Sequence, residues 1–165
     1  MLAEQLMLEH DIPVVLIEPK PVKLNRTSRK RCRKWLRKKD LPVPDDNMEL
    51  LVVTQLTEEF YGLSGASADA VEACQKAALI IGMHPDEATG AIVETANQLH
   101  KPFAVVPCCV FARKFSERRR RDGEPVVLYE DLLSFLEESS LDILRATLPV
   151  EGRNVVLWRG KEEGN

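Results

Sequence analysis

Two titratable side chains stand where a short apolar segment meets a predicted helix. His84 and Asp86 lie in the segment His84-Pro-Asp-Glu-Ala-Thr89. Imidazole titrates near neutral pH and suits proton transfer, and a carboxylate such as Asp86 can act as a general base or orient an acceptor. We predict that both residues are catalytic. The alternative is mechanical, with Pro85 in the first turn of the helix and Asp86 as its cap.

Cys108 and Cys109 form a vicinal pair. Adjacent cysteines rarely form a disulfide with each other, because the geometry is strained. Three interpretations stay open: the pair packs and shapes a substrate loop, a thiolate acts as nucleophile with His84 as its base, or the pair holds a metal. We assign no metal ligand, because His84, His100 and Cys74 lack a ligand spacing such as C-x-x-C.

Strands and helices alternate along the chain. Short apolar runs predict strands at 12–18, 50–56, 77–83 and 102–107, with the first, third and fourth buried. Helical patterns predict helices at 1–10, 24–39, 68–76 and 129–139, and one that opens at the 84–89 turn. Residues 141–150 and 154–158 suit a hairpin. The sequence therefore predicts an α/β fold, a doubly wound, mostly parallel sheet with a C-terminal antiparallel hairpin.

The predicted topology selects a functional edge. In open α/β sheets, ligands bind beyond the carboxyl ends of the strands. That rule selects Glu18, the 57–59 region, residues 82–86 and residues 107–109, which are far apart in sequence and are expected to converge along one rim. A carboxylate at the position of Glu18 can accept both ribose hydroxyls of a nucleoside. Its alternative is a solvated acid at a strand end.

Basic residues are concentrated in two segments. The chain has 165 residues, with 23 Lys and Arg against 26 Asp and Glu and a net charge of −3. Residues 20–39 hold eleven of the basic residues and no acid, and residues 113–121 hold six more. Such density is typical of sites for phosphate or nucleic acid, because each neutralised phosphate releases counterions. The alternatives are a solvated helix face with a loop at 113–124, and a nuclear-localisation signal at 29–39.

Composition excludes several classes of protein. The chain is 44% hydrophobic and 30% charged, which fits one domain over 1–165 with a sizeable core and argues against disorder. No apolar run approaches the length of a membrane span, so we expect no membrane partner. Residues 1–10 carry no basic residue, unlike a secretory signal. Four cysteines without such a signal predict an intracellular protein, cytoplasmic or nuclear.

The order of strand ends resembles a known family. The chain looks like a class I S-adenosylmethionine-dependent methyltransferase. The resemblance rests on a closing hairpin and on four strand ends, which lie at Glu18, near Glu58, at Gly82-Met-His-Pro-Asp-Glu-Ala-Thr89 and at Pro107-Cys-Cys109. The His turn and the Cys-Cys strand end resemble the tRNA ribose methyltransferases and their relatives, which carry His-x-Cys-Gly-x-x-Thr and Cys-Cys-His-His. This chain has Pro85-Asp86 in place of Cys-Gly and Val110-Phe111 in place of His-His.

The resemblance implies a cofactor, a substrate and roles for particular residues. It implies S-adenosyl-L-methionine as cofactor, with Glu18 on the ribose, Glu58 or Glu59 on the adenine, and Gly82 and Met83 lining the site. The loop of His84 and Asp86 would face the methyl group. The substrate would be RNA, a tRNA among the candidates, held through 20–39 and 113–121. Its contacts would be Pro107, Cys108, Cys109, Arg113, Arg118 and Arg119.

One part of the resembled fold is absent from the sequence. These enzymes open with a strand and an Asp-x-Gly-x-Gly turn, where only glycine lets the backbone approach the cofactor closely. No glycine precedes Glu18, and residues 1–10 look like the helix that would follow that turn. The absent strand would be central, between the strands that end at Glu18 and Met83. Three explanations of the absent strand are open. The sequence is a fragment, the protein is a relative that binds without catalysing, or a partner chain supplies the strand. We expect this chain to bind the cofactor poorly or not at all.

Two other functions stay open at this point. The first is a non-catalytic nucleic-acid-binding module on the same fold, which the basic segments support. The second is a metal- or thiol-dependent enzyme built on the cysteine pair. The sequence does not specify the methyl acceptor or the oligomeric state.

Overall fold

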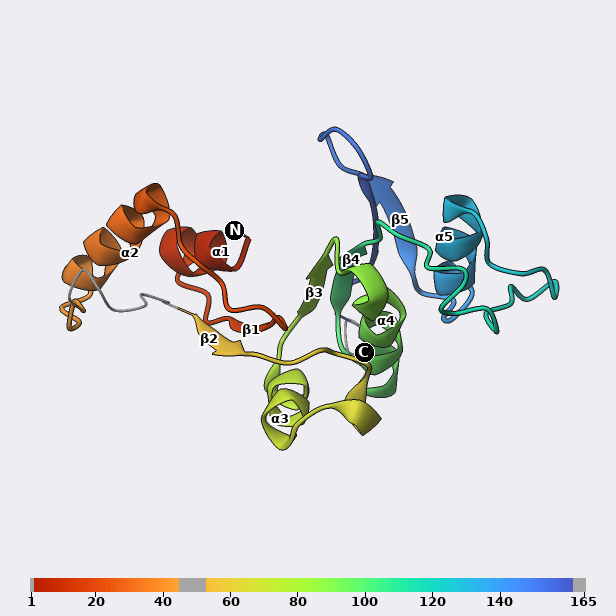
Figure 1. Ribbon diagram of the computed structural model, residues 1–165, viewed down its shortest axis with the longest axis horizontal. Helices are drawn as coiled ribbons and strands as arrows, with labels where there is room; N and C mark the ends of the chain where they lie inside the picture. Colours follow the sequence, from red (N-terminus) through yellow and green to blue (C-terminus); the bar gives the residue numbers. More distant parts are fainter. Residues whose placement is uncertain (1, 45–52, 162–165) are drawn as a thin grey trace. The chain divides into compact units, whose positions relative to one another are not determined.

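The chain forms two compact units, Met1–Phe60 and Tyr61–Asn165. The computed structural model describes residues 2–44 and 53–161, and Figure 1 traces them from the N-terminus in red to the C-terminus in blue. Both units contain helices and small sheets, so the mixed α/β class is confirmed. The doubly wound sheet, and the single domain over 1–165, stay predictions.

The first unit pairs two helices with a small parallel sheet. Its elements are α1 (Leu2–His10), β1 (Val15–Ile17), α2 (Arg26–Lys38) and β2 (Thr54–Leu56). β1 and β2 are parallel, with Ile17 opposite Leu56, so both strands end at the same edge. Asn25 caps α2, since its Oδ1 accepts a hydrogen bond from Ser28 N at 2.9 Å. Residues 50–52 of the second predicted strand lie outside the described residues.

Helix α2 packs against α1 along one side only. Cys32 is completely buried there, and the buried Glu4 of α1 accepts a hydrogen bond from Ser28 Oγ at 2.8 Å. Arg31 reaches Glu9 with its Nη2 at 2.6 Å from Oε1. At the end of the helix, Lys39 pairs with Asp11. These contacts use the α1 side of α2 and leave the other side to solvent.

The second unit contains a mixed sheet of four strands. Its helices are α3 (Ala68–Lys76), α4 (Thr89–Gln98) and α5 (Tyr129–Glu137), with short 3-10 helices at Leu63–Gly65 and Asp86–Ala88. Its strands are β3 (Ile80–Met83), β4 (Phe103–Val106), β5 (Leu144–Thr147) and β6 (Val155–Arg159), in the order β3-β4-β6-β5. β3 and β4 are parallel, and β6 is antiparallel to both β4 and β5. The predicted C-terminal hairpin is confirmed.

The core of this unit lies between one face of the sheet and two helices. Phe103 and Val105 alternate with outward residues of β4 and lie on the face that meets α4, which packs on β3 and β4 (Figure 1). Leu132, Leu133 and Leu136 of α5 are buried on its inner side. The buried cluster consists of Val93, Ala96, Phe103, Val105, Val126, Leu132, Leu133, Leu136 and Leu157.

Strand β3 is less buried than the sequence predicts. It is an edge strand of the described sheet, and Ile81 and Met83 are 38% and 47% exposed on the face away from α4. On the same face of the sheet, Trp158 of β6 is 37% exposed. An apolar run predicted full burial, but within this unit only the alternate residues of β3 face the core. In the first unit Val15 of β1 is likewise exposed.

A buried arginine joins the helix, the sheet and a loop of the second unit. Arg159 of β6 donates hydrogen bonds from Nη1 to Asn97 Oδ1 at 2.8 Å and from Nη2 to the carbonyls of Ala96 and Lys101 at 2.8 and 2.9 Å. Its Nε lies 3.5 Å from Asp142 Oδ2. Arg159 therefore satisfies carbonyl groups that the C-terminus of α4 leaves without helical partners.

The helices of the described residues are all too short or too polar to span a bilayer.

Candidate functional site

The carboxyl ends of β3 and β4 lie side by side. Met83 is opposite Val106, and the pairing continues one residue further, since His84 N donates to Val106 O at 3.1 Å. The segments 84–86 and 107–109 therefore leave the sheet at the same edge. The sequence predicted this juxtaposition, and the structure confirms it for these two strands.

Asp86 is the first residue of the 3-10 helix, and its side chain contacts the segment after β4 and does not cap a helix. His84 and Asp86 have φ angles of 50° and 47°, a left-handed conformation that L-residues rarely adopt. Thr89 Oγ1 donates to Asp86 O at 2.8 Å and fixes the turn. No side-chain cap is formed at the start of the 3-10 helix or of α4. The alternative role of Asp86 as a helix cap is therefore wrong.

Asp86 instead contacts the first cysteine of the vicinal pair. Cys108 Sγ donates a hydrogen bond to Asp86 Oδ1 at 3.2 Å. Burial, and next the hydrogen bond to the Asp86 carboxylate, raise the pKa of the Cys108 thiol to about 12. The thiol of Cys108 therefore stays protonated at neutral pH, which disfavours its role as a free nucleophile. Cys109, beside it, is exposed.

Two residues that the sequence analysis did not select support this edge. Tyr129, the first residue of α5, donates its hydroxyl hydrogen bond to Pro107 O at 3.2 Å. The Arg153 guanidinium lies 3.9 Å from the centre of the Tyr129 ring. Burial raises the pKa of the Tyr129 hydroxyl. The only sequence signal was an aromatic residue at a helix start and an arginine in a hairpin turn, which carries little information by itself.

The packing of the core explains the glycine at position 82 without any ligand. A Cβ added there would lie 2.8 Å from Ile92 Cδ1 and 3.1 Å from both Pro85 Cγ and Val105 Cγ2. These side chains pack α4 and the turn against β3. Met83, in contrast, is 47% exposed at the end of the strand. Of the two predicted cofactor contacts on β3, Met83 is thus the one open to solvent.

The substitution Gly82→Ala is expected to lower the free energy of unfolding by about 1–3 kcal/mol, because the new methyl group overpacks the core. Ile92→Val removes the closest atom, so the double variant Gly82→Ala/Ile92→Val should recover part of that loss. Urea denaturation of the two single variants and the double variant measures the coupling. Simple additivity of the two losses would contradict this packing account.

The predicted acids of the first unit gather at the ends of β1 and β2. Glu18 N donates to Leu56 O at 3.1 Å, which extends the pairing beyond Ile17. Glu18 Oε1 accepts from Lys20 N at 3.3 Å. Glu58 and Glu59 follow β2 at the same edge and each has an interaction partner. The structure thus brings Glu18 and the 58–59 pair to one edge of this sheet.

Most cations of the basic loop have partners inside the second unit. Lys114 pairs with Glu87, Arg120 with Asp122 and Asp131, and Arg121 donates to the Glu138 carbonyl. Burial lowers the pKa of Arg118, whose guanidinium lies 3.6 Å from the Phe115 ring centre. Arg119 donates to two backbone carbonyls of its own loop.

The predicted phosphate contacts of this loop are therefore unequal. The guanidinium of Arg118 packs closely against Gly90, since a Cβ added at Gly90 would lie only 2.7 Å from its Nη2. Across residues 2–44 and 53–161, Arg113 and Arg119 form no ion pair with an acid. Both are exposed, so they are the loop residues best placed to meet a phosphate.

Helix α2 carries the largest exposed group of cations. Arg26, Lys30, Lys34 and Lys38 follow one another at intervals of four residues and are all exposed. At 1.5 Å per residue, neighbours in this row are about 6 Å apart along the helix. Arg37 lies beside the end of the row and is also exposed. We call these five residues the cationic row; within the described residues none of their side chains forms an ion pair or a hydrogen bond.

Trp35 is not free to stack on bases in this structure. Its Nε1 donates a hydrogen bond to Asp11 Oδ1 at 3.0 Å. Asp11 also pairs with Lys39, and these bonds from Lys39 and Trp35 lower the pKa of its carboxyl. Trp35 therefore contributes to the packing of the first unit.

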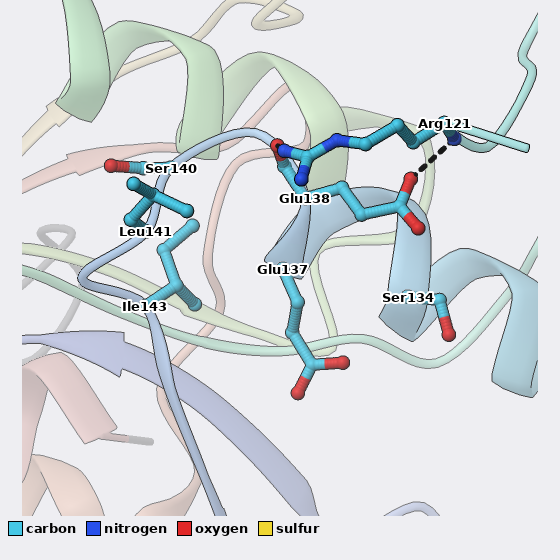
Figure 2. A pocket seen from close by; sticks show the side chains of 7 residues that line it. All are labelled: Arg121, Ser134, Glu137, Glu138, Ser140, Leu141 and Ile143. Atoms are coloured by element: carbon cyan, nitrogen blue, oxygen red, sulfur yellow. Dashed lines mark hydrogen bonds between the residues drawn. The ribbon is translucent and has the colours of Figure 1, made fainter.

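A shallow depression in the second unit lies apart from these residues. It has a volume of about 330 Å³ and is lined by Arg121, Ser134, Glu137, Glu138, Ser140, Leu141 and Ile143. Figure 2 shows Glu138 turned toward Arg121, whose backbone N lies 2.6 Å from Glu138 Oε2. Glu137 lies 4.0 Å from Arg145. No predicted catalytic or cofactor residue lines this depression, and the carboxylates of Glu137 and Glu138 already contact Arg145 and the backbone N of Arg121.

Comparison of the chain with protein-family models, with curated proteins and with solved structures finds no match. The resemblance to methyltransferases therefore remains an expectation from the sequence.

Proposed function

We propose that the chain is a methyltransferase-like protein that uses S-adenosyl-L-methionine and acts on RNA. The observation that carries the proposal is the meeting of Asp86 and Cys108, 3.2 Å apart, beyond adjacent parallel strands. His84 lies in the same turn and is exposed. This edge is where open α/β sheets bind their ligands.

The order of strands within each unit supports the proposal. Among the described strands, β1 pairs only with β2, and β3 pairs only with β4. Each of β1 and β3 therefore has one edge to which a further strand can add. Each of these open edges is compatible with the addition of the strand that the methyltransferase resemblance lacks. A terminal antiparallel pair, β5 and β6, completes the resemblance.

Groups suited to a nucleoside cofactor are present, but a glycine-rich turn is not. Among the described residues, Lys20 N is the one donor to the Glu18 carboxylate, through Oε1, so Oε2 is open to ribose hydroxyls. Glu58 or Glu59 would accept the adenine amino group. No glycine precedes Glu18 in the sequence, so cofactor binding should be weak. The cofactor would supply an activated methyl group.

The residues of the β3 edge would position the acceptor and remove its proton. His84 and Asp86 lie on a turn with left-handed backbone angles, and the Asp86 carboxylate contacts Cys108 beyond β4. As the acceptor gains the methyl group it loses a proton, which Asp86 or His84 would take. Most of the rate enhancement would come from proximity and orientation, because methyl transfer is a direct displacement that needs alignment.

The cationic row of α2 is the RNA-binding element of the proposal. Its exposed charges lie at regular intervals and match a run of phosphates rather than a single one. Arg113 and Arg119 would add contacts near the cysteine pair. Phosphate contacts of this kind position a substrate without reading its sequence, so they do not identify the RNA.

Transfer of a labelled methyl group from S-adenosyl-L-methionine to bulk tRNA tests the proposal. The assay should use the cofactor in excess, because weak binding is expected. We expect incorporation by the wild type and its loss in Asp86→Ala, whereas the matched variant Asp122→Ala, an exposed acid of the basic loop, should keep it. Incorporation that survives Asp86→Ala would remove Asp86 from the mechanism.

The cationic row also favours a second candidate, a nucleic-acid-binding module without catalysis. This function requires α2 but neither His84 nor Asp86. RNA binding with a steep salt dependence, unchanged by Asp86→Ala and accompanied by no methyl transfer, would select it. Binding that does not respond to salt would count against both candidates.

A further inference from the structure

Three metal-ligating side chains converge beyond β3 and β4. A carboxylate oxygen of Asp86, Sγ of Cys108 and Sγ of Cys109 all lie within 4.8 Å of one another. We infer that these three residues form a binding site for one divalent metal ion of the zinc type. The inference goes beyond the proposed function, because metal binding here needs neither a cofactor nor RNA.

The ligand atoms are close to the separations that a tetrahedral ion requires. Zinc binds thiolates at roughly 2.3 Å and carboxylate oxygens at roughly 2.1 Å, which places its ligands about 3.5–4 Å apart. The recorded distance from Cys108 Sγ to Asp86 Oδ1 is 3.2 Å, so a small outward shift admits the ion. The ion would take the place of the proton that Cys108 now donates to Asp86.

The donor set selects the kind of metal. Two sulfur ligands favour zinc and other thiophilic ions, whereas magnesium and calcium prefer sites made of oxygen alone. Two thiolates and one carboxylate bring three negative charges to a doubly charged ion. The sequence left a metal on the cysteine pair as one open interpretation and assigned no ligand, because His84, His100 and Cys74 lack a ligand spacing such as C-x-x-C. The contact of Asp86 with Cys108 supplies a third ligand from another strand end.

Strand pairing and hydrogen bonds position the three ligand residues even when no metal is bound. The parallel pairing of β3 with β4 brings the two strand ends together. Thr89 Oγ1 fixes the Asp86 carbonyl at 2.8 Å, and the Tyr129 hydroxyl bonds to Pro107 O next to the cysteine pair. A site built on sheet ends is better preorganised than one on a long loop.

The site has the character of an open metal centre. Asp86 and Cys109 are exposed and Cys108 is half-buried, so a fourth position on the ion faces solvent. Three protein ligands with one position for water or substrate are typical of catalytic zinc, whereas structural zinc is enclosed by four protein ligands. A water or substrate hydroxyl at the fourth position would become more acidic.

Cobalt substitution tests the site on the full chain, without cofactor or RNA. The chain is stripped with a chelator and titrated with Co²⁺, and zinc is then added. We expect one equivalent of Co²⁺ to produce tetrahedral visible bands and a sulfur-to-cobalt charge-transfer band, which zinc should abolish. Cys109→Ser, at an exposed position that should fold, is expected to weaken Co²⁺ binding by more than about 100-fold, since even outer-shell changes cost roughly 10–100-fold.

Matched variants locate the ligands. Asp86→Asn should weaken binding, whereas Glu87→Gln, which removes the neighbouring acid of the same turn, should leave it unchanged. The double variant Cys108→Ser/Cys109→Ser keeps the buried thiols Cys32 and Cys74 and should show no charge-transfer band. Absence of the band in the wild type, its persistence in the double variant, or equal effects at positions 86 and 87 would overturn the inference.

Discussion

Replacing Lys30, Lys34 and Lys38 together by glutamine is expected to weaken binding of the chain to RNA by about 100-fold at moderate salt. These three residues belong to the cationic row, are exposed and have no ion-pair partner among the described residues. Each phosphate contact releases condensed counterions, so the slope of log affinity against log salt should fall by roughly 2–3. Glutamine is a good helix former, so α2 should stay intact.

Filter binding of bulk tRNA over a series of salt concentrations measures both effects. The matched control is Lys76→Gln/Lys101→Gln/Lys161→Gln, which changes the net charge of the chain equally but leaves α2 untouched. The control should alter affinity only slightly. If the two triple variants bind alike, RNA responds to net charge and α2 is not the binding element. Circular dichroism should be the same for all three proteins.

The largest effect on stability is expected at Arg159. Arg159→Met should lower the free energy of unfolding of the second unit by about 3–4 kcal/mol, because it removes three hydrogen bonds and takes the guanidinium donor from the Lys101 carbonyl and from Asn97 Oδ1, whereas the Ala96 carbonyl keeps the Lys101 N–H. Asp142, held 3.5 Å from Nε, would lose its partner as well. The substitution keeps an apolar stem of similar length, so the loss reports the guanidinium.

Urea unfolding followed by the fluorescence of Trp158 measures this loss. A Trp35→Phe background removes the tryptophan of the first unit, so the signal comes from β6. Arg145→Met is the matched control, since Arg145 lies on neighbouring β5 and pairs at the surface with Glu130 at 2.9 Å. A surface pair of this kind is worth at most about 1 kcal/mol. Equal losses for the two variants would show that Arg159 does not join α4 to the sheet.

Periodicity and caps predicted the local elements well. The helix at 68–76 has the predicted bounds, and Asn25 caps α2. The inward leucines of α5 and the terminal hairpin follow from simple spacing rules. The strands at 12–18, 77–83 and 102–107 exist, but each is shorter than its apolar run.

Long-range pairing and exposure were less predictable. An apolar run does not reveal that β3 is an edge strand with one open face, because burial depends on which strand lies beside it. Charge counts did not reveal that Arg118 packs on Phe115, or that Lys114 and Arg120 pair with acids distant in sequence. Gly82 was assigned to the cofactor, whereas its packing against Ile92 became visible only in three dimensions. The proposed metal site likewise depends on a contact visible only in three dimensions, that of Asp86 with Cys108.

The central claim is that strand ends distant in sequence bind one nucleoside cofactor. Titration of the isotope-labelled chain with S-adenosyl-L-methionine, followed by amide NMR, tests it most directly, because weak binding is visible in this way. We predict that the amide signals of Glu18, Gly82, His84 and Cys108 shift together, with a single shared dissociation constant in the millimolar range. Glu18→Gln should weaken the shift of all of them. Micromolar binding would show that the site is built without a glycine-rich turn. Shifts confined to either the Glu18 edge or the β3 and β4 edge, or no shifts at all, would contradict the account.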